Sequence, residues 1–427
     1  MNNKNLNNQS SLSKEQVDSV MGLYSSGKLN EAIATIKSLN KNYPNVPLLF
    51  NILGVCYKAQ GQLEKSIQIF EKAVTIKPDY AEVHNNLGIT FLQLHKLDAA
   101  VNSFTSAISY MPNFHGAHYN LGISLKKLGK LDAAAKSYRT VIALKPDHAE
   151  AHNNLGTVLK SLGQLDSAVK SYNQALIIKE NYAEAYNNLG SVLKDLGNLD
   201  EAIKNFKKAI TNNQNFHQAY YNYGSTLLDL GQIDSANKIF EKAITLNPNY
   251  AEAHNNLGVT YKELGQLDVA VKCYEKAIKI KPDYAEAHNN LGLVFMNLGK
   301  MSSAAEHIEK ALKIRPDYAY ANNNYGSVLK QIGKFNASIK YYEMALTINP
   351  DYFEAHNNLG NTFKYLKRHD ESLQSYQRSF DLKPDAKYVL GSLVHSKLHL
   401  CLWSNLTGQC KEIIRKINNN EKSIDPF

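Results

Sequence analysis

Nine asparagines recur along the chain at intervals of 34 residues, and they form the most regular set of polar side chains in the sequence. Asparagine is a poor residue for a helix interior, so nine of them in register need a cause. A carboxamide offers both a donor and an acceptor, so a row of them suits the backbone of an extended peptide. Alternatively, each amide bonds a neighbouring helix and only stabilises the stack. The set comprises Asn86, Asn120, Asn154, Asn188, Asn222, Asn256, Asn290, Asn324 and Asn358.

Six glutamates each lie four residues before one of these asparagines, which places both side chains on one face of a helix. Asp79 and Glu82 are three residues apart, which is the spacing of a capping box at a helix start. A carboxylate there also suits the positive end of the helix dipole. We therefore expect capping as the main role, with contact to a bound peptide as a second role. The glutamates are Glu82, Glu150, Glu184, Glu252, Glu286 and Glu354.

Six histidines lie two residues before asparagines of the same row. A zinc site would need several ligand nitrogens around one ion at about 2.0–2.1 Å. Histidines one repeat apart would be separated by about 10 Å, the usual distance between packed helices. We therefore predict packed histidines and no metal site. The residues are His84, His118, His152, His254, His288 and His356.

No arrangement of residues for catalysis is present in the sequence. It contains no GxGxxG or GxxxxGK[ST] phosphate-binding loop, no HExxH and no GxSxG nucleophile turn. We therefore predict no catalytic residues, no cofactor and no enzymatic activity for this chain alone.

The elements that position these side chains follow from ten glycines, each 34 residues after the last. They are Gly54, Gly88, Gly122, Gly156, Gly190, Gly224, Gly258, Gly292, Gly326 and Gly360. With this glycine as position 8, ten tandem repeats span residues 47–386, and a degenerate capping repeat precedes them at 13–46. The glutamates, histidines and asparagines then stand at positions 2, 4 and 6.

Each repeat predicts two helices. Apolar residues at positions 7, 11 and 14 form one helical stripe, and those at 20, 24, 27 and 28 form another. A glycine at position 15 indicates a left-handed helix stop, and Asp or Asn at position 33 indicates the next N-cap. The glycine at position 8 costs about 1 kcal/mol inside a helix. Close approach of the second helix, through the small residue at position 20, would explain it.

This pattern resembles the tetratricopeptide repeat (TPR). Leu-Gly at positions 7–8, Gly at 15, Ala at 20, an aromatic at 24, Ala at 27 and Pro at 32 carry the resemblance without a gap. It implies an all-α fold, a right-handed α-solenoid superhelix of TPR helix pairs whose first helices line a concave groove. Such repeats bury their core only against their neighbours.

The combination PDYAEAHNNLG also resembles the repeat region of the O-linked N-acetylglucosamine (O-GlcNAc) transferases and their SPINDLY-like relatives. The resemblance implies that the nine asparagines bind peptide. Cys401-Leu402-Trp403 is similar to the Cys-Asp-Trp segment that ends the repeats of that family. Residues 387–427 are interpreted as a C-terminal capping helix and a truncated lead-in to a catalytic domain, and residues 1–12 as a disordered polar N-terminus. The nucleotide-sugar site of the family has no counterpart here.

The sequence thus predicts a scaffold that binds proteins or extended peptides, as the substrate-recognition arm of an O-GlcNAc transferase-like glycosyltransferase. The alternative is an autonomous TPR scaffold that assembles a protein complex. The net charge of +9 is spread along the chain rather than gathered in a stripe, so no nucleic acid is expected. No apolar run approaches 18 residues, so no membrane span is expected. Four cysteines without a CxxC pair favour the cytoplasm, and homodimerisation is left open.

Overall fold

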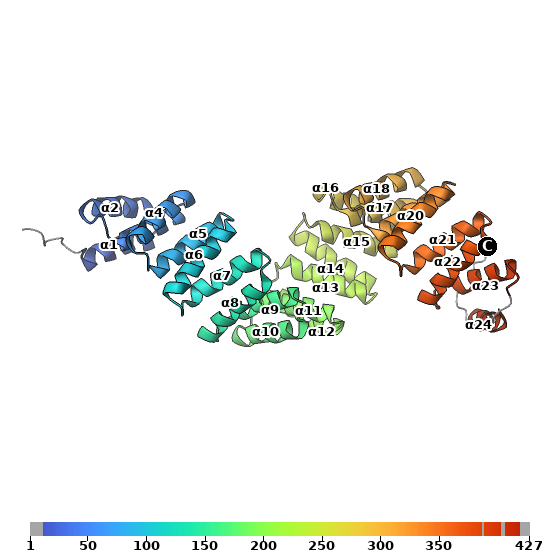
Figure 1. Cartoon of the computed structure of the whole chain (residues 1–427), viewed down its shortest axis with the longest axis horizontal. Helices are drawn as coiled ribbons and strands as arrows, with labels where there is room; N and C mark the ends of the chain where they lie inside the picture. Colours follow the sequence, from blue (N-terminus) through green and yellow to red (C-terminus); the bar gives the residue numbers. More distant parts are fainter. Residues whose placement is uncertain (1–11, 387, 403–405, 419–427) are drawn as a thin grey trace, which may run out of the picture. The chain divides into compact units, whose positions relative to one another are not determined.

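The computed structural model describes residues 12–386, 388–402 and 406–418, and every regular element within these ranges is an α-helix (Figure 1). The chain divides into two compact units, residues 1–214 and residues 215–427. Within each unit, helices that follow one another along the chain pack side by side. The predicted all-α class is therefore confirmed.

In the first unit the helices are α1 (Lys14–Ser25), α2 (Leu29–Asn42), α3 (Pro47–Ala59), α4 (Leu63–Ile76), α5 (Ala81–Gln93), α6 (Leu97–Tyr110), α7 (His115–Lys127), α8 (Leu131–Leu144), α9 (Ala149–Ser161), α10 (Leu165–Ile178), α11 (Ala183–Asp195) and α12 (Leu199–Asn212). In the second unit they are α13 (His217–Asp229), α14 (Ile233–Leu246), α15 (Ala251–Glu263), α16 (Leu267–Ile280), α17 (Ala285–Asn297), α18 (Met301–Ile314), α19 (Ala319–Gln331), α20 (Phe335–Ile348), α21 (Phe353–Tyr365), α22 (His369–Leu382), α23 (Val389–His399) and α24 (Leu406–Asn418).

Each 34-residue repeat forms one helix pair. The first helix occupies positions 1–13 and the second occupies positions 17–30, as α9 and α10 illustrate. The degenerate copy forms the pair α1 and α2. Its first turn is closed by a capping box, in which the Ser13 hydroxyl accepts from the Gln16 N–H and the Gln16 side chain accepts from the Ser13 N–H. The chain therefore enters its first pair through a well-defined helix start.

The turn inside each pair depends on a left-handed residue at position 15. Glycine fills this position in eight of the ten repeats, with φ between 70° and 79°. His95 and Lys367 fill it in the other two, with φ of 57° and 61°. The predicted helix stop is therefore confirmed, and the two non-glycine residues adopt the same backbone conformation at some cost.

The glycine at position 8 is required because the side chain at position 24 fills the space beside it, as an aromatic ring in nine repeats and as Ile308 in the other. A Cβ on Gly156 would lie 2.8 Å from the ring of Tyr172, which stands at position 24. The predicted close approach of the second helix is confirmed. The residue that enforces it is the side chain at position 24, whereas we had expected the small residue at position 20.

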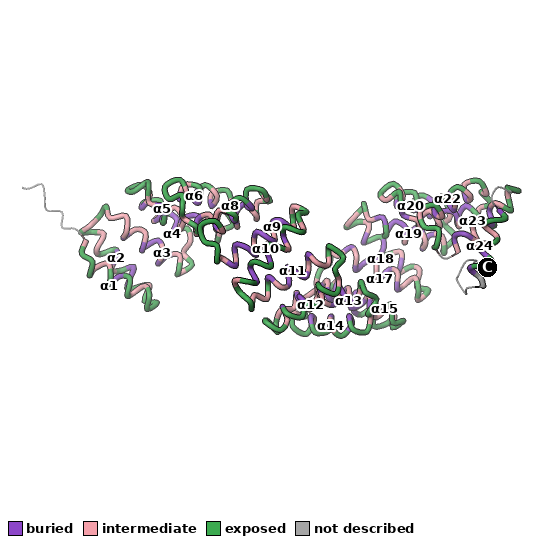
Figure 2. Tube along the Cα trace, turned by 90° about the horizontal axis from the view of Figure 1, so that it is seen from below, coloured by how far each residue is buried: buried purple, intermediate pink, exposed green. Residues whose placement is uncertain are grey.

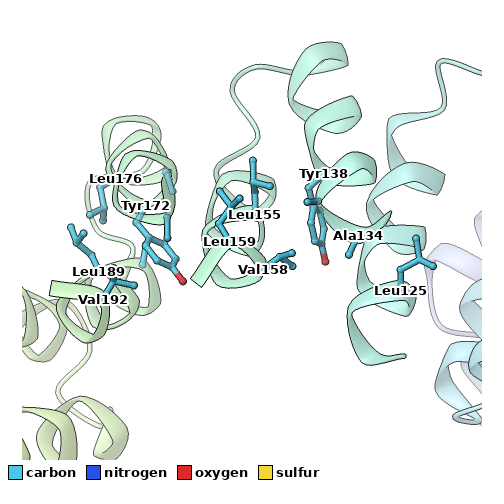
Figure 3. Close-up of a cluster of buried hydrophobic side chains, with 14 residues drawn as sticks. Leu125, Ala134, Tyr138, Leu155, Val158, Leu159, Tyr172, Leu176, Leu189 and Val192 are labelled. Carbon is cyan, nitrogen blue, oxygen red and sulfur yellow. The ribbon is translucent and has the colours of Figure 1, made fainter. Parts of the chain in front are cut away.

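The core lies between successive helices and repeats along each unit. Leu155, Val158 and Leu159 of α9 lie between the rings of Tyr138 from α8 and Tyr172 from α10 (Figure 3). The same cluster continues into α11. Each repeat therefore shares its apolar side chains with both neighbours, which is why an isolated repeat could not bury a core.

Burial alternates along each helix, with buried positions facing the neighbouring helices and exposed positions gathered at turns and outer sides (Figure 2). Each described helix thus has one buried side and one exposed side. None of them combines the length and the apolar content that a bilayer crossing requires.

The predicted N-cap at position 33, and the capping box that it would form with position 2, are wrong. Tyr80 at position 34 is the N-cap of α5, and it makes no side-chain hydrogen bond to the helix end. Asp79 lies inside the preceding turn, in which the Tyr80 N–H donates to the Lys77 carbonyl at 3.2 Å. The Ala81 N–H then donates to the Asp79 carbonyl at 3.0 Å. Because this turn uses position 33, the helix begins one residue later than predicted.

Two helices follow the last full repeat. Leu390, Val394, Leu406 and Ile413 form a buried cluster, and Phe380 of α22 packs against it. A helix is thus present where the C-terminal capping helix was predicted, as α23, and a second helix, α24, follows it. Trp403, the lead-in at 423–427 and most of the polar N-terminus lie outside the described residues. The division into capping segments stays a prediction.

Candidate functional site

The asparagines at position 6 lie half-buried on the first helices, and their amide nitrogens bond the preceding repeat. In eight of them, Nδ2 donates to the side chain at position 5 of that repeat. In the first unit these bonds run from Asn86 to Asn51 Oδ1 (3.0 Å), from Asn120 to Asn85 Oδ1 (3.1 Å), from Asn154 to the Tyr119 hydroxyl (2.9 Å) and from Asn188 to Asn153 Oδ1 (3.1 Å). In the second unit they run from Asn256 to the Tyr221 hydroxyl (3.4 Å), from Asn290 to Asn255 Oδ1 (3.0 Å), from Asn324 to Asn289 Oδ1 (2.9 Å) and from Asn358 to Asn323 Oδ1 (2.9 Å). The amide nitrogens therefore behave as the second interpretation of the row predicts, and bond a neighbouring helix.

The amide oxygens of the same asparagines are used far less. Three of them accept hydrogen bonds: Asn256 Oδ1 from Asn255 at 3.2 Å, Asn222 Oδ1 from Gln218 at 3.4 Å and Asn324 Oδ1 from Asn323 at 3.5 Å. Six other oxygens accept no hydrogen bond within the described residues, and none of the six is a buried atom without a partner. They belong to Asn86, Asn120, Asn154, Asn188, Asn290 and Asn358. The surface formed by positions 2, 5 and 6 of the first helices, here called the asparagine face, thus presents a row of free acceptors.

Position 5 is the part of this face that sequence reasoning missed. It is asparagine in eight repeats and tyrosine at Tyr119 and Tyr221. Asn153 is only 1 % exposed, so its amide needs partners within the protein. The tyrosine at position 34 can supply one, since the Tyr352 hydroxyl accepts from Asn323 Nδ2 at 3.4 Å. The recurring Asn-Asn pair could have indicated the role of position 5. Two adjacent side chains in a helix point in different directions, so one of the two amides has to face a neighbouring helix.

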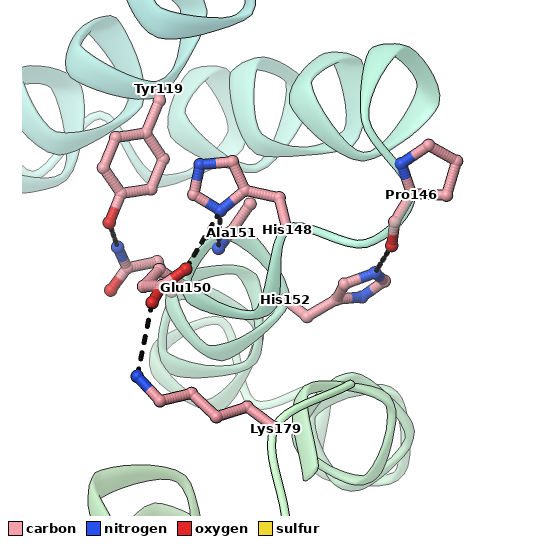
Figure 4. A network of polar contacts seen from close by, with 8 residues as sticks. Tyr119, Pro146, His148, Glu150, Ala151, His152 and Lys179 are labelled. Atoms are coloured by element: carbon pink, nitrogen blue, oxygen red, sulfur yellow. Dashed lines mark hydrogen bonds and ion pairs between the residues drawn. The ribbon is translucent and has the colours of Figure 1, made fainter. Parts of the chain in front are cut away.

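Three of the six glutamates at position 2 form ion pairs across their own repeat. The basic partner stands at position 31 in each case: Glu150 pairs with Lys179 (3.5 Å, Figure 4), Glu252 with Lys281 (3.6 Å) and Glu286 with Arg315 (2.8 Å). Glu184 accepts from Asn153 Nδ2 at 3.4 Å. The pKa of Glu150 is lowered, chiefly by a hydrogen bond from its own backbone N–H at the helix start, and Lys179 adds to this against partial burial. The Glu150 carboxylate therefore stays ionised at the edge of the asparagine face.

The histidines at position 4 bind the turn that precedes their helix. In each, Nε2 lies within hydrogen-bond distance of the carbonyl of the proline at position 32, as His152 and Pro146 show (Figure 4). The pairs are His84–Pro78 (2.7 Å), His118–Pro112 (2.9 Å), His152–Pro146 (3.1 Å), His254–Pro248 (3.1 Å), His288–Pro282 (3.3 Å) and His356–Pro350 (3.0 Å). Across the described residues, no three His, Cys, Asp or Glu side chains form a set that could hold a metal ion. The histidines therefore fix the turns that orient the first helices.

Sequence comparison places these repeats in a known family. The family described as "TPR repeat" matches residues 54–95, 124–163, 156–197, 224–265, 260–299 and 326–366, which together exceed half of the chain. The chain belongs to this family. Related families described as "Tetratricopeptide repeat" match residues 183–216, 285–318, 205–236 and 353–386. The comparison with curated proteins found no match to this sequence.

Solved structures with tetratricopeptide-like folds resemble the chain to different extents. The structure of the APC/C hetero-tetramer Cut9–Hcn1 matches 88 % of this chain and 88 % of its own, with 13 % identity and a TM-score of 0.53. That likeness concerns the fold alone. MamA matches 39 % of this chain and 96 % of its own, with 31 % identity and a TM-score of 0.36. YrrB, described as a TPR protein with an unusual peptide-binding site, matches 44 % and 96 %, with 27 % identity and a TM-score of 0.37.

Proposed function

We propose that these tetratricopeptide repeats bind extended polypeptides along the asparagine face. The observation that carries the proposal is that the nitrogen and the oxygen of the position-6 amides have different roles. Its nitrogen bonds the preceding repeat and so fixes the side chain, while six of the nine oxygens remain free to accept a hydrogen bond. An acceptor held in place before binding costs little further entropy when a ligand arrives.

The spacing of the row suits a peptide backbone. Packed helices lie about 10 Å apart, and an extended peptide advances about 3.3 Å per residue. Each free oxygen can therefore accept from roughly every third backbone N–H of a bound peptide. Recognition of this kind ignores the side chains of the ligand, so one face can serve many client sequences.

The direct test modifies the ligand backbone. A peptide selected on the intact chain from a random 15-residue library is resynthesised with one N-methylated amide at a time. Because N-methylation removes a donor, we expect affinity to fall at every third position and to change little between them. Equal losses at all positions, or no losses, would refute backbone recognition by the row.

Paired variants separate binding from stability. Replacing Asn120 and Asn188 by alanine breaks two inter-repeat bonds and removes two free oxygens. Replacing their partners Asn85 and Asn153 breaks the same two bonds, and also the bond from Asn153 to Glu184, but keeps those oxygens. Both pairs should lower the melting temperature, because each net hydrogen bond is worth about 0.5–1.5 kcal/mol. The first pair should weaken the selected peptide by about tenfold or more. The second pair should weaken it less, because the oxygens remain although their side chains are no longer fixed. Equal affinities for the two variants would contradict the proposal.

We further propose that the repeats serve as the substrate-recognition arm of a protein O-GlcNAc transferase-like enzyme. The support is the resemblance carried by PDYAEAHNNLG and by the position-6 asparagines. The chain alone should bind no UDP-N-acetylglucosamine, and saturable micromolar binding in a calorimetric titration would contradict that expectation. Sequencing the coding DNA beyond the Phe427 codon decides the larger assignment. An open frame for a nucleotide-sugar transferase supports the enzyme, and a stop codon supports the autonomous scaffold.

A further inference from the structure

A groove lies between α10 and α12 in the first unit, with α11 as its floor, and encloses about 770 Å³. Its apolar lining comes from Val169, Leu176 and Ile177 of α10 and from Tyr186, Leu189 and Leu193 of α11. None of these residues stands at positions 2, 5 or 6. The groove is therefore separate from the asparagine face.

The second unit offers a matched groove at the same repeat positions, between α14 and α16 over α15. It is smaller, about 520 Å³. Thr245 stands where the first groove has Ile177, and His254 stands where it has Tyr186. The repeat itself therefore supplies the groove, and positions 29 and 4 give the α10–α12 groove an isoleucine and a tyrosine that its counterpart lacks.

Ile177 is the clearest departure from the repeat. Its side chain is 71 % exposed, more than any other large apolar residue in the described chain. In the nine other repeats the same position is small, polar or charged: Thr75, Ser109, Ala143, Thr211, Thr245, Lys279, Lys313, Thr347 and Asp381. An exposed isoleucine beside an open apolar groove is expected at a contact surface rather than on plain solvated helix.

The rim of the groove carries one charge that has no partner. Glu201 is bonded to Lys204 at 2.8 Å, and the Lys208 ammonium lies over the Tyr186 ring at 5.3 Å. Glu180 is exposed and makes no ion pair within the described residues. It also replaces the proline that most repeats carry at position 32. The groove thus presents an apolar floor with an unpaired negative charge at its edge.

We propose that the α10–α12 groove binds a partner-protein segment that inserts one large apolar side chain beside a lysine or arginine. The apolar side chain would cover Ile177 and lie against Tyr186, and the basic side chain would pair with Glu180. Burying an apolar anchor in a pocket with a charged rim is the usual basis of a local hot spot. This contact is independent of the asparagine face, so the chain can hold two ligands at once.

The test selects binders of the groove from a random 12-residue peptide library displayed on phage. Selection uses the intact chain, and counter-selection uses the double variant Ile177→Thr/Tyr186→His, which converts the groove to the side chains of its α14–α16 counterpart. We expect recovered peptides to combine a large apolar residue with an adjacent lysine or arginine. A synthetic peptide of that type should bind Ile177→Thr at least tenfold more weakly, and Glu180→Gln should remove the salt dependence of its binding.

The controls keep the outcome interpretable. Because Ile177 is exposed, Ile177→Thr should leave the melting temperature unchanged, and Thr245→Ala in the other groove should leave peptide affinity unchanged. Failure to enrich any sequence, or equal binding to wild type and Ile177→Thr, would overturn the proposal. Self-association in analytical ultracentrifugation that disappears in Ile177→Thr would assign the groove to a second copy of this chain instead, which also overturns it.

Discussion

The asparagine face and the grooves between second helices differ in how they change along the chain. The asparagine face carries nearly the same side chains in every repeat, whereas the grooves change from one repeat to the next. At positions 4 and 23, for example, one groove has Tyr186 and Asn205 and the other has His254 and Cys273. A uniform face suits a ligand that is itself periodic, such as a peptide backbone. A variable surface suits a single side chain at a single place.

The largest expected effect comes from the core that both surfaces share. Gly156→Val would drive its side chain into the Tyr172 ring, since even a Cβ would lie 2.8 Å from it. Overpacking and loss of the helix–helix contact should destabilise the first unit by about 3 kcal/mol. Thermal melting followed by circular dichroism measures the loss, and binding at both surfaces should fall together.

Gly163→Ala is the matched control for that variant. Gly163 has φ of 74° and has open space where a Cβ would lie, so only backbone strain of about 1 kcal/mol is expected. A melting temperature as low as that of Gly156→Val would show that the ring contact is not the reason for the position-8 glycine.

A transplant sharpens the comparison between the two grooves. Thr245→Ile together with His254→Tyr gives the α14–α16 groove the apolar side chains of its counterpart. Peptides selected on the α10–α12 groove should then gain a second binding site, about tenfold weaker because Glu180 has no equivalent there. Calorimetry measures the number of sites. A stoichiometry that stays at one would show that the two side chains are insufficient.

The stability of the second unit should depend on pH, because the repeat that contains α17 and α18 has histidines at both position 4 and position 23. His288 and His307 are joined by their Nδ1 atoms at 3.1 Å, which requires at least one neutral ring. Burial lowers the pKa of each, so both release protons on folding. The unfolded chain then binds more protons below about pH 6.5, and stability should fall as the pH drops through that value.

The measurement is the melting temperature of the second unit at pH 7.5 and pH 5.5. His307→Ser, which restores a residue found at this position in other repeats, should reduce the loss between the two pH values. An unchanged pH dependence in that variant would place the titrating group elsewhere.

The smallest effect concerns the glutamates at the edge of the asparagine face. Glu286→Gln removes the ion pair with Arg315. The Glu286 side chain is 41 % exposed and that of Arg315 is 38 % exposed. The loss of stability should therefore be under about 1 kcal/mol and should vanish at high salt. Glu82→Gln is the control, because Met111 stands at its position 31 and no pair exists to lose. If Glu286→Gln weakens peptide binding tenfold while stability is unchanged, the glutamates belong to the binding site rather than to the scaffold.

Much of the fold could be predicted from spacing alone. The glycines at positions 8 and 15 mark one tight helix contact and one left-handed turn per repeat, and both are physical requirements that a sequence displays directly. Asp79 was misplaced because a proline followed by aspartate suits both a turn and an N-cap, and only the backbone path decides between them.

The polar contacts were harder to predict. The asparagines at position 6 were recognised as a row, but their donor bonds to position 5 depend on the offset between neighbouring helices, which no local pattern specifies. The α10–α12 groove was missed because it arises from departures such as Ile177 and Glu180. An analysis that looks for the recurring residues of a repeat disregards the positions at which one repeat differs from the others.

The bonds between position 6 and position 5 give each unit a direction. Every such bond runs from a later repeat to an earlier one, so within a unit the carboxamide dipoles line up instead of alternating. A surface built in this way is vectorial: it distinguishes one end of a bound strand from the other. A client peptide should therefore bind with a single polarity, and the same residues joined in reverse order should bind as an unrelated ligand.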